Sequence, residues 1–275
     1  MNVFVALLVV VASSAAAISA LLLVRRHAPD GSYFNDGDRA AGVFGVLATG
    51  FAVLLGLVVV LAFTSYDESR AGAETEALTL AQQYEVAHLL PPAAGRRLAS
   101  ELLCYGRSVV HEEWPRMQDG TQTDAANPWG VALFRTLRGI EPKTASQQAA
   151  YAKWLDQRLD RESARSARIH GAVGVIPGPL WLVLFVIAAM IVGFMLLFAD
   201  SGEPAFVQAT LIGTVVAVMA ATLLVIGFLN NPYRPGLGSL QPTAMQRTLR
   251  ILDEERQIVG DRTPPPCDER GLARV

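Results

Sequence analysis

The side chains that could do chemistry are few, and they are scattered along the chain. The clearest grouping is His111-Glu112-Glu113, which looks like half of a helical metal-binding motif. That motif needs a second histidine four residues after the first, where this chain has Pro115. Neighbouring residues also point in different directions from a helix. We therefore favour the alternative reading, a charged helix end beside a core Trp114, with no metal bound.

The remaining reactive side chains show no recognised spacing. The two cysteines are too few for a disulfide framework and have no metal-ligand spacing, so we expect ordinary thiols. Glu74 and Glu76 are typical of solvated acids on a helix. The sequence contains no phosphate-binding glycine loop, nucleophile elbow or Rossmann fingerprint. We predict no catalytic residue, no metal, no cofactor and no enzymatic function. The four histidines, His27, His88, His111 and His170, lie far apart in the sequence, and the two cysteines are Cys104 and Cys267.

The composition indicates a membrane protein. Hydrophobic residues make up 52% of the 275 residues, and only 17% are charged. A soluble domain usually carries about 25% charged residues. The formal net charge is −2, which argues against nucleic-acid binding, because that needs an excess of Lys and Arg. The expected surroundings are therefore membrane lipids.

Four apolar stretches are long enough to cross a bilayer, which takes about 20 residues of helix. They contain no Asp, Glu, Lys or Arg and cover residues 3–24, 42–64, 180–199 and 206–229. The first could instead be a secretory signal, since residues 13–20 are rich in small side chains. Its start lacks a positive charge, however, and its apolar run exceeds that of a signal. We predict a retained helix.

The distribution of Lys and Arg predicts the orientation. Arg25, Arg26 and Arg39 follow the first stretch, whereas more arginines flank the other side, and the link at 200–205 has none. Both termini and the long middle region are therefore predicted to be cytoplasmic, in a multi-pass protein of the cell membrane. The Arg25-Arg26 pair argues the other way. The arginines on the opposite side are Arg70, Arg161, Arg165, Arg168, Arg234, Arg247 and Arg250.

The middle region has the apolar spacing of amphipathic helices. Residues 73–90 are expected to form a helix, which is a candidate extension of the second membrane helix, and Pro91-Pro92 ends it. One apolar stripe follows, made by Leu98, Leu102, Tyr105 and Val109, with Leu103, Val110 and Trp114 beside it. A further helix is expected over 146–169, with Trp154, Leu155 and Leu159 facing inward.

The C-terminal segment is expected to contain one short amphipathic helix. It is marked by Met245, Leu249 and Leu252 after Pro242. The tail from Gly260 has scattered charge and a proline run, which predicts disorder. The fold class is thus an all-α membrane protein with four transmembrane helices and a helical cytoplasmic region between the second and third. The predicted parts are 1–64 (helices one and two), 65–178 (cytoplasmic region), 179–230 (helices three and four) and 231–275 (C-terminal helix and tail).

The second apolar stretch has a distinctive pattern of small residues. Gly42, Gly45, Thr49, Ala52 and Gly56 recur every three or four positions and share one helix face. Such a face allows close helix packing in lipid, which is one interpretation. The other is that the helix lines a pore with a hydrophobic constriction. The pore-lining candidates are Phe44, Gly45, Thr49, Phe51, Ala52, Gly56 and Phe63.

Several segments together resemble the bestrophin-like domain family of bacterial and plant membrane proteins. The resemblance covers about residues 42–245, and no one of its motifs is very specific. It rests on Val43-Phe44-Gly45-Val46-Leu47, Leu55-Gly56-Leu57, Tyr66-Asp67-Glu68-Ser69-Arg70, Glu76-Ala77, Tyr105, Val109-Val110-His111-Glu112-Glu113-Trp114-Pro115, Ile176-Pro177, Trp181, Asn231-Pro232-Tyr233 and Gly236. Within these motifs Glu76, Glu112, Glu113, Trp114 and Pro115 have no established role.

The resemblance implies a function and an architecture. Bestrophins are pentameric ion channels with four membrane helices, a helical cytosolic region between the second and third, and a pore lined by the second. It therefore implies a homo-oligomer that conducts small ions. This chain shows no acidic cluster equivalent to the bestrophin calcium clasp, so calcium gating is not implied.

The sequence allows three functions. The first is an oligomeric bestrophin-like ion channel with the second helix lining the pore. The alternative is a non-conducting membrane scaffold or sensor whose cytoplasmic helices bind a partner. A membrane enzyme ranks last, because the membrane segments carry no convergent polar residues.

Overall fold

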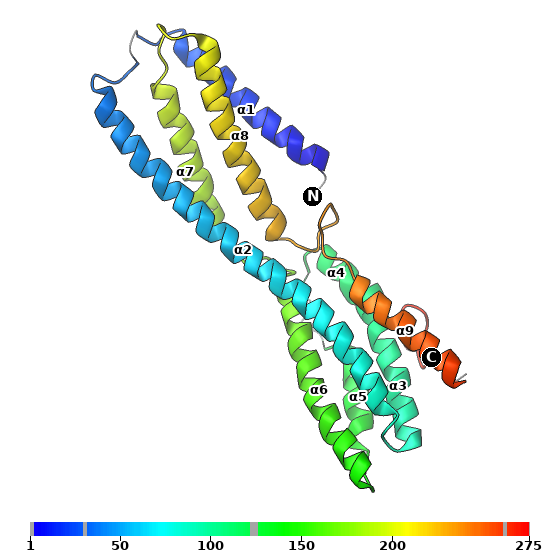
Figure 1. The fold of residues 1–275 in the computed structure, drawn as a ribbon. Helices are drawn as coiled ribbons and strands as arrows, with labels where there is room; N and C mark the ends of the chain where they lie inside the picture. Colours follow the sequence, from blue (N-terminus) through cyan, green and yellow to red (C-terminus); the bar gives the residue numbers. More distant parts are fainter. Residues whose placement is uncertain (1–2, 30–31, 122–125, 261–262, 275) are drawn as a thin grey trace. The chain divides into compact units, whose positions relative to one another are not determined.

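The structure, a computed structural model, describes residues 3–29, 32–121, 126–260 and 263–274. Within these ranges the regular elements are helical, and they follow one another along the chain as shown in Figure 1. The elements are α1 Val3–Arg25, α2 Gly37–Ala87, α3 Pro92–Ser108, the π-helical turn η1 Val109–Glu113, α4 Trp114–Gln118, α5 Pro128–Arg138, α6 Ala145–His170, α7 Gly178–Leu197, α8 Ala205–Leu229 and α9 Thr243–Val259.

The chain divides into two compact units, and α2 contributes residues to both. The membrane unit comprises Met1–Ser65 and Gly174–Asn230, and the helical unit comprises Tyr66–Val173 and Asn231–Val275. The membrane unit contains α1, the first half of α2, α7 and α8, all long and apolar enough to span a bilayer. The four predicted crossings are therefore confirmed. The continuation of the second crossing is also confirmed, because α2 runs unbroken for 51 residues.

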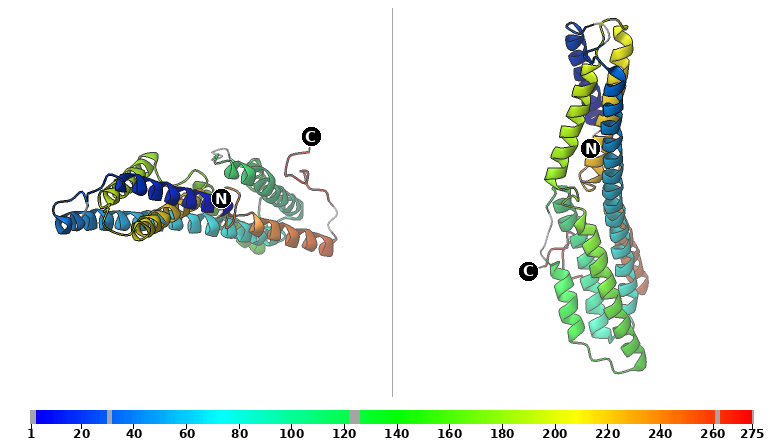
Figure 2. Two further views of the ribbon diagram at one scale, coloured as in Figure 1. Left: turned by 90° about the horizontal axis from the view of Figure 1, so that it is seen from above. Right: turned by 90° about the vertical axis from the view of Figure 1, so that its left-hand side faces the viewer.

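Two clusters of apolar side chains hold the membrane unit together. In the first, α1 packs along α8, as Figures 1 and 2 show. Their approach is close: a Cβ placed on Gly213 would lie 2.9 Å from Cδ1 of Ile18. In the second, Phe51 and Leu55 of α2 are buried with Leu184 and further residues of α7 and α8. Small and branched side chains permit this packing in lipid, where no hydrophobic force drives helices together.

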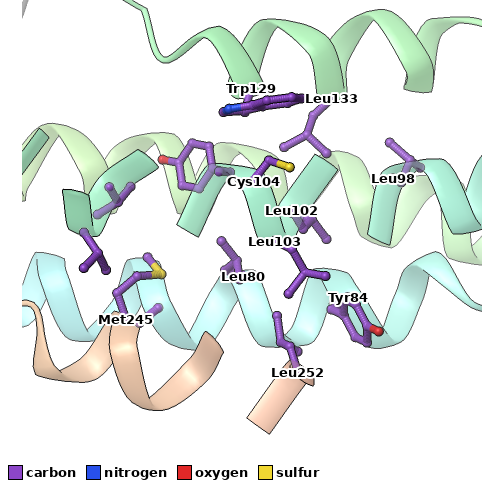
Figure 3. Packing of buried hydrophobic residues seen from close by; sticks show 14 of the residues in the cluster. Leu80, Tyr84, Leu98, Leu102, Leu103, Cys104, Trp129, Leu133, Met245 and Leu252 are labelled. Atoms are coloured by element: carbon purple, nitrogen blue, oxygen red, sulfur yellow. The ribbon is translucent and has the colours of Figure 1, made fainter. Parts of the chain in front are cut away.

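The helical unit has its own apolar core, part of which Figure 3 shows. Leu80 from α2, Leu102 and Leu103 from α3, and Met245 and Leu252 from α9 meet there with little or no exposure to solvent. The predicted stripes of α3 and the predicted C-terminal helix are thus confirmed. Burial of this apolar surface is the main force that folds the unit.

The ends of the helices follow local sequence signals. Pro92 begins α3, and Asn127 and Thr144 cap α5 and α6 by accepting hydrogen bonds from the backbone N–H groups of Trp129 and Gln147. Gly260 ends α9 with a φ of 73°, a left-handed conformation that suits glycine.

Four features of the helical unit differ from the sequence expectations. Helix α6 buries Trp154 as predicted, but Leu155 and Leu159 are exposed. Helix α5 is an addition to the predicted helices. Of the tail predicted to be disordered, residues 261–262 and 275 lie outside the described residues, and residues 263–274 are ordered against the unit. Its Cys267 forms a disulfide with Cys104 rather than remaining a thiol. Three of these differences depend on contacts between segments far apart in sequence. The exception is α5, which begins at the local Asn127-Pro128 signal.

Candidate functional site

The small-residue face of α2 (Gly42, Gly45, Thr49, Ala52 and Gly56) is exposed along its whole length. A Cβ added to any of its three glycines would meet no atom within 4 Å. The small residues therefore do not serve packing inside this chain. They leave room for something outside it, which could be another helix or an aqueous path.

The seven pore-lining candidates lie on more than one side of α2. Gly45, Thr49, Ala52 and Gly56 lie on the small-residue face, and Phe63 is also exposed further along the helix. Phe51, in contrast, is 4% exposed and packs inside the chain's own core with α7 and α8.

Phe44 takes an intermediate position. Its ring is half-buried and stacks on Phe194 of α7 with the ring centroids 5.8 Å apart, and it meets Phe198 edge-on. The structure thus separates Phe44 and Phe51, which hold α2 against its neighbours, from the candidates that remain available to an outside partner or lumen.

The membrane-spanning stretch of α2 offers little polarity. Thr64 donates its hydroxyl to the carbonyl of Val60, so this group is used within the helix. The exposed Thr49 is the one hydroxyl on the small-residue face. A path along this face would therefore be mostly apolar, and apolar constrictions control water and ion entry by dewetting.

In the helical unit, two residues of the family motifs meet around one arginine. Glu76 of α2 accepts hydrogen bonds at Oε2 from Arg168 Nε (2.5 Å) and at Oε1 from Arg168 Nη2 (3.1 Å). Glu113 of η1 accepts at Oε2 from the same Nη2 (2.5 Å). All three side chains are almost wholly buried. Such charge-assisted contacts are the strongest class of protein hydrogen bonds.

Further partners complete this arrangement, which we call the buried ion cluster: Glu76, Glu113, Arg165 and Arg168. Arg165 Nη2 donates to Glu113 Oε1 (3.0 Å), and Asn127 Nδ2 donates to the same oxygen (2.9 Å). The Tyr105 hydroxyl donates to Glu76 Oε1 (2.6 Å). The cluster therefore contains two carboxylates and two guanidinium groups, and its net charge is zero.

Local structure explains how these side chains reach one another. Gly72 lets α2 approach α6 closely, since a Cβ there would lie 2.7 Å from the carbonyl oxygen of Ala164. The π-helical turn η1 follows α3 directly, and it turns Glu113 inward while Glu112 stays half-exposed. π-helical turns of this kind occur often at functional positions.

The electrostatics favour the charged forms of the cluster. Burial alone would raise the pKa of Glu113, but the charges of Arg168 and Arg165 and the hydrogen bonds to them hold it below its ordinary value. Burial opposes the charge of Arg168, yet Glu76 and Glu113 raise its pKa well above the ordinary value. Burial and then the charge of Glu76 raise the pKa of Tyr105. The carboxylates are saturated with donors, which suits a structural role better than acid–base chemistry.

The other family-motif residues lie at the edge of this cluster. Trp114 is buried, donates its indole N–H to the carbonyl of Leu240 (3.4 Å), and its ring lies 5.9 Å from the guanidinium carbon of Arg168. Glu112 pairs with Arg116 near the surface, and Pro115 is exposed.

The sequence did not reveal the cluster, and the expectation that Glu76 is a solvated acid was wrong, because the structure buries it against Arg168. Arg165 and Arg168 were read there only as charges that indicate membrane orientation. A signal for the buried arginines was present, because Trp154, Arg161 and Arg168 recur every seven residues, which is about two turns of α6. All three side chains are buried. Because the buried face of α6 contains arginines, the spacing of apolar residues predicted Leu155 and Leu159 to face inward instead.

Comparisons with known proteins agree with this architecture. The family model described as Bestrophin-like domain matches residues 11–245. A search of curated proteins finds no match. Among solved structures, the chain is similar to a bacterial bestrophin homologue from Klebsiella pneumoniae, at a TM-score of 0.66 and 15% identity over 95% of this chain and 100% of that one.

Other solved structures give the same result. A point variant of the Klebsiella pneumoniae homologue has a TM-score of 0.66 with 15% identity, over 93% of this chain and 98% of the other. A structure described as a membrane protein has a TM-score of 0.64 with 15% identity, over 99% and 100%. At this identity the likeness concerns the fold.

Proposed function

This chain belongs to the Bestrophin-like domain family, and on that premise we propose that it is a homo-oligomeric ion channel whose α2 helices line a central path. The observation that carries the proposal is the small-residue face of α2, which is exposed and at whose three glycines an added Cβ would meet no atom within 4 Å. Several copies of this face around one axis would leave space for a narrow, mostly apolar pore. Gly45, Thr49, Ala52, Gly56 and Phe63 are the proposed lining residues, whereas Phe44 and Phe51 support α2 from behind.

The helical unit supports the oligomeric part of the proposal. Leu155 and Leu159 of α6, Leu78 of α2 and Ile258 of α9 are exposed by between 37% and 85%. This unit lies outside the apolar stretches, so these side chains would face water in a monomer. Large apolar side chains exposed in this way mark protein interfaces when they gather in patches. Leu155 and Leu159, one helical turn apart, form the most regular pair.

The proposed orientation places the helical unit and both termini in the cytoplasm. It rests on the excess of arginines beside the ends of α2, α7 and α8 that adjoin this unit. Reporter fusions at the two termini would test it, and a signal from the outer side would overturn it.

Purified protein reconstituted into liposomes would test the conducting function. Flux of K⁺ or Cl⁻ is measured by an ion-sensitive dye, and the number of subunits by native mass spectrometry. We expect a ring of several subunits and a flux above that of empty vesicles. A folded oligomer without flux of either ion would favour the scaffold or sensor function instead, and a monomer would overturn the pore.

A further inference from the structure

The C-terminal strap, residues 263–274, is fastened to the helical unit by one covalent bond. Cys267 of the strap is bonded to Cys104 of α3 across a sequence separation of 163 residues, and neither cysteine is exposed. The sequence has only these two cysteines, so no alternative disulfide exists within the chain.

The strap forms a small turn that rests on α3 and α5. Its own hydrogen bonds join Asp268 N–H to the Leu272 carbonyl (2.9 Å) and Arg274 N–H to the Pro266 carbonyl (2.9 Å). Gly271, with a φ of 83°, lies so close to α3 that a Cβ would be 2.4 Å from the Ser108 nitrogen.

The noncovalent contacts of the strap with the rest of the unit are modest. Trp129 donates its indole N–H to the Gly271 carbonyl (2.6 Å), and Arg107 Nη1 donates to the Asp268 carbonyl (3.2 Å). At the start of the strap, Arg256 Nη2 of α9 donates to the Thr263 carbonyl (2.5 Å), a contact outside the 268–274 turn. Leu272, the one large aliphatic residue of the strap, is 49% exposed. A few hydrogen bonds and small buried side chains offset little of the entropy lost when a dozen residues are ordered.

The strap also forms one wall of a cavity of about 450 Å³ in the helical unit. Gly271, Leu272 and Ala273 line it together with Glu113 and Trp129. Glu113 belongs to the buried ion cluster, so displacement of the strap would expose a surface next to that cluster.

We propose that the Cys104–Cys267 disulfide is a redox switch that decides whether the strap covers this cavity. A dithiol reductant attacks Cys267 when the strap frays, which forms a mixed disulfide and releases the Cys104 thiolate. The second thiol of the reductant then displaces Cys267. Two electrons pass from the dithiol to the protein, both cysteines end as thiols, and the reductant ends as a disulfide. The freed strap leaves the surface, because its remaining contacts do not hold it.

The proposed cytoplasmic location of this unit gives the switch its physical setting. Reducing compartments keep most thiols reduced, and disulfides found there are usually transient or redox-sensing. A bond that is formed and broken in such a compartment can report a change of redox state.

Hydrogen exchange on the full-length protein in detergent, with and without dithiothreitol, tests the switch. Thiol counting by mass spectrometry first establishes that the bond is present without reductant and absent with it. We expect amides 268–274 to exchange at least tenfold faster after reduction, while amides of α3 around Leu102 keep their protection. Cys267→Ser should show the fast strap without reductant. Trp129→Phe, which loses the hydrogen bond to Gly271 but keeps the disulfide, should keep a slow strap.

Three outcomes would overturn the proposal. Strap exchange that does not change after verified reduction would show that the noncovalent contacts suffice. Loss of protection that spreads through α3 would make the disulfide a staple of the whole unit. Two free thiols in protein trapped and purified without reductant would show that the bond does not form.

Discussion

Glu76 and Arg168 form a buried ion pair between α2 and α6, although 92 residues separate them in the sequence. Neither side chain is exposed, and Arg168 reaches on to Glu113 in the π-helical turn η1. One guanidinium group therefore joins three segments of the helical unit.

Replacement of Arg168 by Met should strongly destabilise the helical unit. The change leaves Glu76 buried without its guanidinium partner, and breaking one side of a buried pair costs about 3–5 kcal/mol. Denaturant unfolding followed by circular dichroism measures the effect. The matched control is Arg70→Met, which removes an exposed pair with Glu74 on the same helix α2. We expect that control to lose less than about 1 kcal/mol, and equal losses would refute a special role for Arg168.

Acid should remove the contribution of Glu113 to stability. The pKa of Glu113 in the folded state lies below its ordinary value of 4.5. Its charged form therefore stabilises the fold fully above about pH 4.5, and this stabilisation is lost as the pH falls through the lowered pKa. We expect Glu113→Gln to be less stable than the native chain at neutral pH. The difference should shrink as the pH falls below 4.5. Unfolding free energies measured across the acid range test this, and a difference independent of pH would contradict it.

A bulky residue on the small-residue face of α2 should block conduction. Gly56→Trp fills space that is empty within the chain, so an isolated subunit should still fold. We expect liposome flux to fall at least tenfold if that space becomes the pore. Gly193→Trp on α7 is the matched control, because it too meets no atom within 4 Å. Its flux should stay near the native value, and equal inhibition by both variants would argue against an α2 pore.

A charge on the exposed apolar pair of α6 should weaken subunit assembly. Leu159 is 66% exposed in the single chain, and a carboxylate in its place would be desolvated at a subunit contact. We expect Leu159→Glu to shift the native mass distribution toward smaller assemblies. Lys153→Gln changes the charge by the same amount at another exposed position of α6 and should leave the distribution unchanged. If Leu159→Glu leaves the oligomer unaltered, α6 is not part of the subunit interface and the prediction is wrong.

The sequence was informative wherever a property is local. A run of about 20 apolar residues is long enough to span a bilayer, whatever its neighbours are. The predicted crossings therefore agree with α1, α7 and α8 to within a few residues, and the second one lies inside the longer α2. The apolar stripe of α3 and the amphipathic α9 were predictable for the same reason, since helical spacing shows directly which face is apolar.

Only the tertiary structure decided which distant side chains meet. Helix α6 buries Arg161 and Arg168 and exposes Leu159, because hydrogen-bond acceptors on another helix compensate the buried charges. The apolar periodicity of α6 alone does not reveal that these acceptors are there. The pairing of Cys104 with Cys267 likewise requires the fold to bring together two residues that are 163 positions apart in the sequence. The side of α2 that remains open was also undecided, because small residues suit close packing and an open path equally well until the contacts of the folded chain are known.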